Sequence, residues 1–234
     1  MKQILIAVLI FALYFLENIT INILTKIVGM NPLIATALSV LIFSVCVFFI
    51  VKKAPFRSKA NTASASSKNK DSLMLFIATA VLMLINLYPF DVKFNLDAWN
   101  VVIQMFFVGA VEELIFRGYV FHFFEKKKNY KYAIILSSLC FGLIHFTNFF
   151  NDYWLLVLLQ ILCATCIGIV YSITYHKTRK LYLCILCHAL SNISANIGSS
   201  ESLEKEFLFS VVCILLAVLF VWMQAPARKA AQWQ

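Results

Sequence analysis

The sequence predicts an all-α, polytopic membrane protein with about eight transmembrane helices. The 234-residue chain is 62% hydrophobic and only 13% charged, and it contains 22 Phe, which is outside the composition of ordinary soluble domains. A membrane-spanning helix needs about 20 apolar residues, and eight apolar segments approach that length. They cover residues 4–24, 32–51, 73–89, 99–121, 132–149, 153–175, 181–197 and 207–224.

The first segment is predicted to be an uncleaved transmembrane helix. Lys2 precedes the apolar run, as in a signal peptide, but no small-x-small cleavage site follows it. The second segment begins at Pro32, and all four prolines of the chain lie at predicted helix ends, where a missing N–H costs least.

A polar stretch separates the first two segments from the other six. Residues 57–72 are rich in Ser, Ala, Asn and Lys and have no apolar periodicity, which is typical of a flexible cytoplasmic loop. We therefore divide the chain into two N-terminal helices (1–56), this loop, a transmembrane core (73–225) and a cytoplasmic tail (226–234).

The positions of the basic residues predict the orientation in the membrane. With the N-terminus inside, the cytoplasmic segments hold 16 of the 20 Lys and Arg residues, and the outer segments hold only Lys26, Lys93 and Lys205. This asymmetry follows the positive-inside rule and predicts that both termini are cytoplasmic. The net charge of +9 therefore indicates a cell-membrane protein beside anionic lipid and no nucleic-acid partner. His122 and His176 fall at the cytoplasmic interface, where we expect them to be solvated.

The fourth segment carries three ionisable residues, Glu112, Glu113 and Arg117, in an otherwise apolar run. A charge at the centre of a membrane helix costs roughly 2.5 to 3.5 kcal/mol on insertion scales, so such residues usually serve chemistry or transport. Glu113 and Arg117 are four residues apart, a spacing that allows an ion pair on one helix face. Glu112 would then point to a different face, free to act.

Two further segments each carry a histidine, His145 and His188, and Asn192 lies one turn after His188 on the same helix face. At a rise of about 1.5 Å per residue, these three residues and Glu112 lie roughly 10 to 20 Å from the cytoplasmic helix ends. We expect the four side chains to meet in one layer between the cytoplasmic half and the midplane.

These side chains are typical of a hydrolase that attacks a carbonyl with activated water. A carboxylate beside an imidazole can take a proton from water, and a second histidine with an Asn amide can donate hydrogen bonds to an oxyanion. A proton relay in a transporter uses similar residues, but the sequence shows no pair of interrupted helices of the kind found in inverted-repeat carriers.

Three motifs resemble those of the type II CAAX prenyl endopeptidase and bacteriocin-processing family, called CPBP or Abi. Residues 112–118, Glu-Glu-Leu-Ile-Phe-Arg-Gly, match its EExxxR motif; residues 141–145 match FxxxH, and residues 188–192 match HxxxN. The three motifs stand in order on separate membrane helices, and the resemblance covers about residues 99–197.

The resemblance implies an intramembrane endopeptidase that acts on a membrane-associated peptide or protein. The residues that it implicates have three roles: water activation by Glu112 and His145, an oxyanion hole from His188 and Asn192, and support of the helix by Glu113 with Arg117.

Two alternatives stay open. The family was once regarded as metalloproteases, and Glu112, His145 and His188 form a possible zinc ligand set. We favour a mechanism without a cofactor, because the chain has no HExxH motif. Members of the family are also linked to bacteriocin self-immunity, where such a protein protects the membrane by binding rather than by cutting.

The remaining polar and thiol groups of the spans are expected to be structural. Two Cys-x-x-Cys pairs imitate the spacing of a zinc ribbon, but their different depths on two helices disfavour a tetrahedral site and favour buried free thiols. Isolated polar residues are expected to satisfy polar neighbours. The residues concerned are Cys163, Cys166, Cys184, Cys187, Glu17, Asn86, Gln104 and Gln160.

Overall fold

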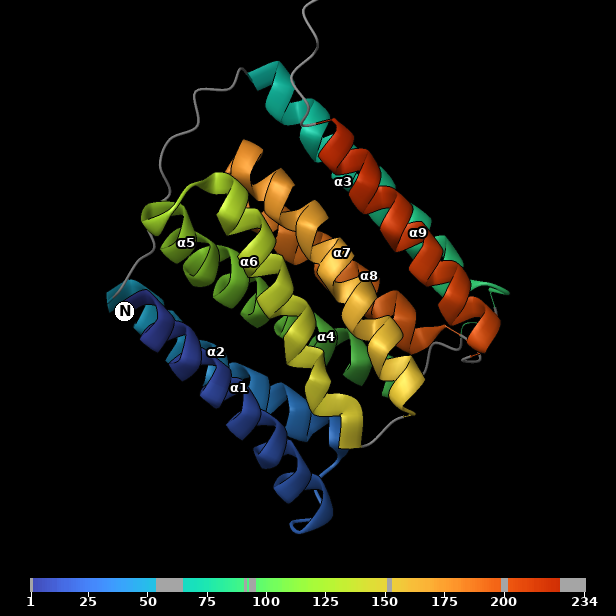
Figure 1. The fold of residues 1–234 in the computed structure, drawn as a ribbon. Coiled ribbons are helices and arrows are strands. Elements are labelled where there is room, and N and C mark those ends of the chain that lie inside the picture. Colours follow the sequence, from blue (N-terminus) through green and yellow to red (C-terminus); the bar gives the residue numbers. More distant parts are fainter. Residues whose placement is uncertain are drawn as a thin grey trace, which may run out of the picture.

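The computed structural model describes residues 2–53, 65–90, 92, 96–150, 153–198 and 202–223, which are predominantly helical (Figure 1). Two short elements depart from α-helical geometry: η1 is a π-helix and η2 a 3₁₀-helix. In chain order the elements are α1 (Lys2–Lys26), α2 (Pro32–Lys53), α3 (Ala65–Leu87), α4 (Leu96–Glu113), η1 (Leu114–Val120), α5 (Phe121–Lys127), α6 (Tyr130–Leu143), η2 (Ile144–Phe150), α7 (Trp154–Thr178), α8 (Leu181–Ile197) and α9 (Leu203–Trp222).

The all-α, polytopic fold class is confirmed. Six helical stretches have the length and composition to cross a membrane: α1, α2, Lys68–Leu87, Asp97–Lys127, α7 and α9. Two shorter apolar helices, Tyr130–Phe146 and Leu181–Ile197, correspond to the fifth and seventh predicted spans. Large apolar side chains such as Leu5 and Trp222 are exposed on the outside of the bundle, as lipid contact requires. The protein is therefore a multi-pass membrane protein.

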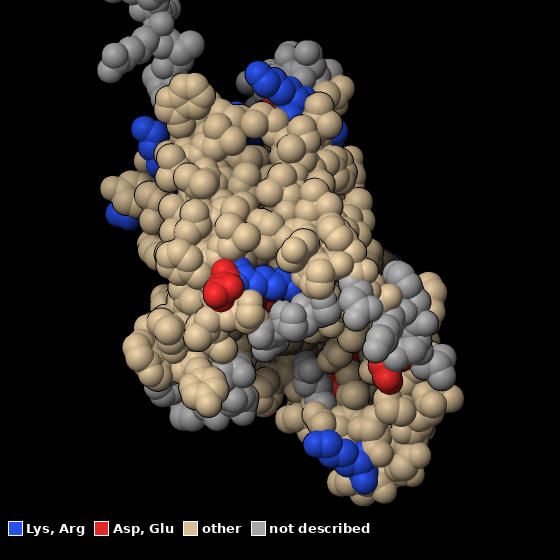
Figure 2. Space-filling view, turned by 90° about the vertical axis from the view of Figure 1, so that its right-hand side faces the viewer, with Lys and Arg blue, Asp and Glu red and all other residues tan. Residues whose placement is uncertain are grey.

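The charged side chains agree with this arrangement. Figure 2 shows a region without charged side chains in the upper part of this face, with Lys and Arg side chains above it and acidic and basic side chains below it. The basic residues Lys53, Lys127 and Lys180 lie at the end of the bundle where α2 and α5 end and α8 begins. The predicted cytoplasmic orientation of this end stays a prediction.

Several predicted boundaries shift. α3 begins at Ala65, so residues 65–72, which were expected in the flexible loop, are helical instead. The regular α-helix of the fourth span stops at Glu113 and that of the fifth stops at Leu143, where η1 and η2 begin. The rest of the predicted loop, 57–64, and the predicted tail, 226–234, lie outside the described residues.

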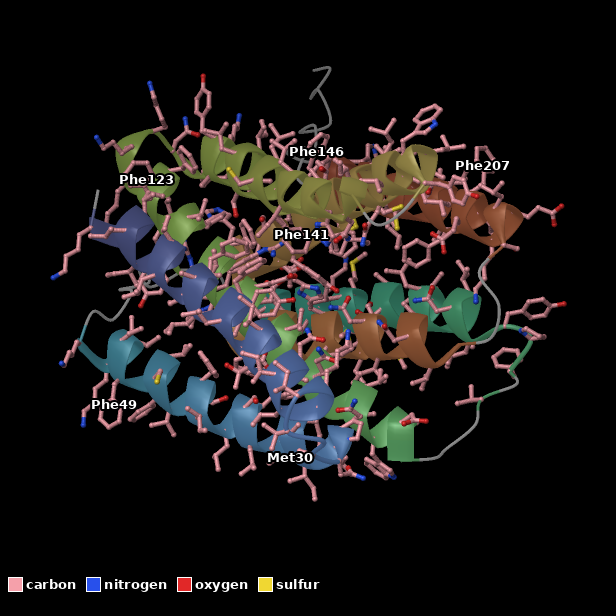
Figure 3. All side chains as sticks on the ribbon, turned by 90° about the horizontal axis from the view of Figure 1, so that it is seen from below. Met30, Phe49, Phe123, Phe141, Phe146 and Phe207 are labelled. Atoms are coloured by element: carbon pink, nitrogen blue, oxygen red, sulfur yellow. The ribbon has the colours of Figure 1, made fainter. Side chains whose placement is uncertain are left out.

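The helices pack in three layers (Figure 1). The α1–α2 hairpin lies on one side of the molecule, α3 and α9 lie on the opposite side, and α4–α8 lie between them. α7 contacts α6, α9 and α3, while α4 packs along α8. In Figure 3 the ring of Phe141 lies inside the bundle, whereas Phe49 and Phe207 project outward. The helices that carry the motifs therefore belong to the middle layer, between the α1–α2 hairpin and the α3–α9 pair.

The expectations for the structural residues have mixed outcomes. The four thiols of the two Cys-x-x-Cys pairs are buried and free, as expected. The Asn86 side chain donates to Ser194 Oγ at 3.0 Å, and Gln160 accepts from Asn148 at 2.9 Å, so both have polar partners. The expectation for Glu17 is wrong, since neither of its carboxylate oxygens has a hydrogen-bond partner among the described residues.

Candidate functional site

The site lies beside a close contact between α4 and α8. A side chain at Gly109 would place its Cβ 3.0 Å from the backbone nitrogen of Ala189, so the absence of a side chain there permits this approach. Glu112 and Glu113 follow one turn after Gly109, and His188 directly precedes Ala189. The close contact therefore brings the two carboxylates to the imidazole.

Glu113 and Arg117 form the ion pair that their spacing predicts. Arg117 Nη1 donates to Glu113 Oε1 at 2.7 Å, and both side chains are completely buried. Arg117 Nη2 also donates to the carbonyl of Gly168 on α7 at 3.2 Å. The guanidinium carbon lies 4.5 Å from the ring centre of Phe141 and 5.4 Å from that of Tyr171, within cation–π range. The pair thereby connects η1 with α6 and α7.

His188 lies between the two glutamates. Its Nδ1 is 3.0 Å from Glu113 Oε1, and its Nε2 is 3.5 Å from Glu112 Oε2. A carboxylate only accepts hydrogen bonds, so the contact with Glu113 assigns the proton to Nδ1. Nε2 then faces Glu112, whose side chain is 12% exposed and thus the more accessible of the two carboxylates. The four side chains form a continuous array from Glu112 through His188 and Glu113 to Arg117.

His145 and Asn192 lie near this array without joining it directly. His145 lies in η2, where its Nδ1 is 3.1 Å from the carbonyl of Phe141. The imidazole rings of His145 and His188 both pack edge-on against the Phe141 ring, at centroid distances of 5.6 and 5.4 Å. Asn192 is half-buried on α8, one turn after His188. Within the described residues, no hydrogen bond or ion pair links Glu112 to the side chain of His145 or Asn192, and the nearest ionisable neighbour given for its carboxylate is His188.

Sequence reasoning missed two aromatic contributors. Tyr171 is buried on α7, and its ring lies 5.7 Å from that of His188. No local pattern distinguishes Tyr171 from other apolar positions in the long α7 segment. Phe141 was visible as the first residue of the FxxxH motif, but its packing between Arg117 and the two histidines was not.

The π-helix η1 carries Arg117 and is held by side chains of neighbouring elements. The N–H of Phe121 donates to the carbonyl of Phe116, five residues before it, which is the π-helical pattern. Ser137 on α6 donates to the same carbonyl at 2.8 Å, and His122 Nδ1 lies 3.1 Å from the carbonyl of Arg117. Short π-helical segments often occur at functional sites.

The expectation that His122 is solvated is therefore wrong. His122 is 1% exposed, and the Tyr175 hydroxyl lies 3.5 Å from its Nε2. Its predicted interfacial depth did not reveal that α5 turns this ring inward against α7. His176 is partly exposed, stacks on Tyr130 with a centroid distance of 4.4 Å, and has Glu125 as a neighbour at 3.6 Å.

The proposed zinc ligand set does not come together in this geometry. Glu112 and His188 are neighbours, but the described residues contain no group of three or more His, Cys, Asp or Glu side chains arranged to hold a metal ion. His145, the third proposed ligand, has its Nδ1 directed to a backbone carbonyl. The arrangement offers two adjacent ligands where a catalytic zinc site needs three.

Comparison with known proteins agrees with the motifs. Residues 94–194, which include all three motifs, match the family model described as "Type II CAAX prenyl endopeptidase Rce1-like". Over these residues the chain is similar to this family of membrane peptidases. A relative from Bacillus subtilis (strain 168), "Putative membrane peptidase YdiL", is 28% identical over 102 residues, which is 42% of this chain. The matched part covers 38% of the length of that relative. The Rce1-like segment coincides with the middle layer that holds the Glu112–His188–Glu113–Arg117 array.

Proposed function

We propose that the protein is an intramembrane endopeptidase that hydrolyses a membrane-associated peptide or protein with water activated by Glu112. The observation that carries the proposal is the contact of Glu112 Oε2 with His188 Nε2 at 3.5 Å, behind which a buried carboxylate and a buried guanidinium are aligned. Groups of this kind are costly inside a membrane protein and usually have a chemical role.

The positions of these groups support the following reaction. A water molecule bound to Glu112 gives up a proton to the carboxylate while its oxygen attacks the carbonyl carbon of the scissile peptide bond. The carbon–nitrogen bond of the tetrahedral intermediate then breaks, and Glu112 returns the proton to the leaving amine. The products are a carboxylic acid and an amine, which at neutral pH are present as a carboxylate and an ammonium group, so atoms and charge balance without a cofactor.

His188 and Asn192 stabilise the negative charge that develops on the carbonyl oxygen. Glu113 accepts from Nδ1 of His188, and this orients Nε2 toward the reacting side. Asn192 supplies an amide donor one turn further along α8, and His145, which packs against the same Phe141 ring as His188, assists Glu112 in activating the water. A preorganised donor of this type typically contributes about 100- to 1000-fold to the rate.

Peptide analysis of membranes tests the proposal. Purified full-length protein, reconstituted in liposomes, is incubated with isolated membranes, and new peptide termini are identified by mass spectrometry. Glu112→Gln keeps the shape of the side chain and removes its basicity, so we expect termini that the unmodified protein generates and this variant does not. Glu204→Gln, which changes an exposed glutamate of α9, is the matched control and is expected to retain cleavage.

Two results would contradict the proposal: no new termini with the unmodified protein, or the same termini with Glu112→Gln. A role in bacteriocin self-immunity by binding would be favoured by two results together. These are the absence of new termini and an unchanged bacteriocin sensitivity of cells that carry Glu112→Gln.

A further inference from the structure

Tyr171 on α7 packs against two side chains of the array but belongs to none of the three motifs. Tyr171 is 2% exposed, and its ring centre lies 5.7 Å from that of His188 and 5.4 Å from the guanidinium carbon of Arg117. His188 and Arg117 are the two groups that bind Oε1 of Glu113. One aromatic ring therefore contacts both partners of the same carboxylate oxygen.

The orientation of the His188 ring decides which of its atoms face the two glutamates. The torsion about the Cβ–Cγ bond of a histidine is broad, so a staggered side-chain rotamer does not fix the plane of the ring. A half-turn about this bond exchanges Nδ1 with Cδ2 and Nε2 with Cε1. The flipped ring would present carbon atoms to Glu113 and Glu112 in place of nitrogen atoms. Packing that restricts this rotation therefore preserves the array.

Two aromatic rings from different helices pack against the imidazole. The Phe141 ring of α6 meets it edge-on, with centres 5.4 Å apart and planes at 89°, whereas the Tyr171 plane is tilted by 35°. A rotation of the imidazole about its Cβ–Cγ bond changes both contacts. Phe141 belongs to the FxxxH motif, so Tyr171 adds a second restraint on His188 from outside the motifs.

Tyr171 is held in a closely packed part of α7. The carbonyl of Gly168, three residues earlier, accepts from Arg117 Nη2 at 3.2 Å. A Cβ at Gly168 would lie 3.1 Å from the Cα of Ser138, so α7 and α6 are in close contact at this level. The Tyr171 carbonyl accepts from the Cys184 thiol of α8 at 3.7 Å. The ring thus projects from a backbone that contacts three other elements, and rigid helices position a site more precisely than loops do.

The ring of Tyr171, and not its hydroxyl, makes the contacts with the array. The hydroxyl is buried and comes near the Ser191 side chain, but it does not reach hydrogen-bond geometry with any residue that the structure describes. Removal of a buried hydroxyl without a partner is nearly neutral or stabilising. A phenylalanine at this position should therefore preserve the role of the ring.

We propose that Tyr171 is a positioning residue for His188, whose ring keeps Nε2 directed toward Glu112 while Nδ1 donates to Glu113. The inference rests on the peptidase function proposed above and extends it to a residue outside the motifs. Tyr171 acts through His188 rather than on the substrate. Because a misplacement of about 1 Å can cost about 100-fold in rate, we expect loss of the ring to slow hydrolysis by roughly 10- to 100-fold.

Nitrogen NMR of the purified full-length protein in detergent tests this role without a substrate. The protein carries histidine labelled with an NMR-active nitrogen isotope, and the His188 signals are those that His188→Gln lacks. We expect one set of shifts, for an imidazole protonated at Nδ1, in the unmodified protein and in Tyr171→Phe. Tyr171→Leu should give averaged or doubled shifts, because a smaller, non-planar side chain lets the imidazole turn. Tyr153→Leu, which changes an exposed tyrosine just before α7, is the control and should keep the single set.

The release of new peptide termini, measured at several membrane concentrations, tests the contribution to hydrolysis. Tyr171→Leu should lower kcat by roughly 10- to 100-fold and leave KM unchanged, because the ring orients a catalytic group and does not bind the substrate. Tyr171→Phe and Tyr153→Leu should keep the rate of the unmodified protein. Denaturant titration shows whether each variant is folded. If Tyr171→Leu is not, Tyr171→Met takes its place, because the flexible methionine side chain fills irregular gaps in a core.

Three outcomes would overturn the inference. The first is an unchanged His188 spectrum in the folded variant that lacks the ring, and the second is a changed spectrum with an unchanged rate of hydrolysis. The third is an equal loss of hydrolysis in Tyr171→Phe, which would assign the role to the hydroxyl. The absence of new termini with the unmodified protein would count against the peptidase proposal alone, since the spectrum still decides whether Tyr171 orients His188.

Discussion

Replacing Arg117 with Ala is the sharpest test of how the charged helix is stabilised. Arg117 and Glu113 are completely buried and 2.7 Å apart, and the guanidinium also bonds the Gly168 carbonyl. Arg117→Ala leaves a buried carboxylate with His188 as its remaining partner. Breaking one side of a buried pair typically costs about 3 to 5 kcal/mol, because the other charge stays uncompensated. We expect a loss of unfolding free energy in this range.

A double variant separates the orphaned charge from the lost packing. Glu113→Gln with Arg117→Met removes both charges and keeps similar volumes, and replacing a whole buried pair with neutral groups is often nearly neutral for stability. The double variant still loses the cation–π contacts of the guanidinium with Phe141 and Tyr171, worth up to about 2 kcal/mol each when desolvated. It should therefore recover part, but not all, of the stability lost in Arg117→Ala.

Denaturant titration in detergent micelles, followed by tryptophan fluorescence, measures these differences. Glu112→Gln serves as the comparison, because it changes the accessible carboxylate and should shift unfolding by less than about 1 kcal/mol while abolishing peptide hydrolysis. If Glu112→Gln were the unstable protein and Arg117→Ala were as stable as the unmodified chain, the roles of the two side chains would have to be exchanged.

Four further perturbations address other parts of the molecule. Gly109→Val places a branched side chain where the Cβ alone already meets α8 at 3.0 Å, so we expect a loss of about 1 to 3 kcal/mol by denaturant titration together with lost hydrolysis; unchanged behaviour would refute the close-contact argument. His122→Phe leaves the Arg117 carbonyl without its side-chain partner and should lower the unfolding free energy by about 1 to 3 kcal/mol, with partial rescue by His122→Asn; equal stability of all three proteins would show that the contact is unimportant. Ser64→Cys in a cysteine-free background should react with a membrane-impermeant thiol reagent only from the cytoplasmic side, and external labelling would invert the topology. Exhaustive chelation should leave peptide hydrolysis unchanged, whereas activity that is lost and then restored by zinc would establish a metalloprotease.

Most of the fold was predictable because lipid imposes a simple rule on sequence. Spanning segments must be long and apolar, so hydropathy alone located the eight helical segments. The boundaries were less predictable where the physical signal is weak. Residues 65–72 are polar and read as a loop, yet they extend α3, in which Asp71 forms an ion pair with Lys177 of α7 at 3.1 Å. A partner on a distant helix is invisible in a local pattern.

The site was predictable as a list of residues but not as a set of contacts. Spacing alone predicted the Glu113–Arg117 pair, because four residues make one helical turn. Depth placed Glu112 near both histidines without indicating which of them it touches. The choice of His188 depends on the approach at Gly109, which sequence spacing does not encode. The π-helical turn after Glu113 was equally hidden, since no residue preference marks it.

The shared oxygen of Glu113 has an electrical consequence for the array. Oε1 accepts from Arg117 and His188 at once, so the charges of Glu112, His188, Glu113 and Arg117 must be counted together. With a neutral imidazole the four side chains sum to a single negative charge. One added proton, on His188 or on Glu112, brings the sum to zero. Low-dielectric surroundings strengthen the interactions among such charges, so a substitution at any one of the four positions changes the electrostatic balance at the other three. A substrate therefore meets the array as one electrical unit and not as four separate side chains.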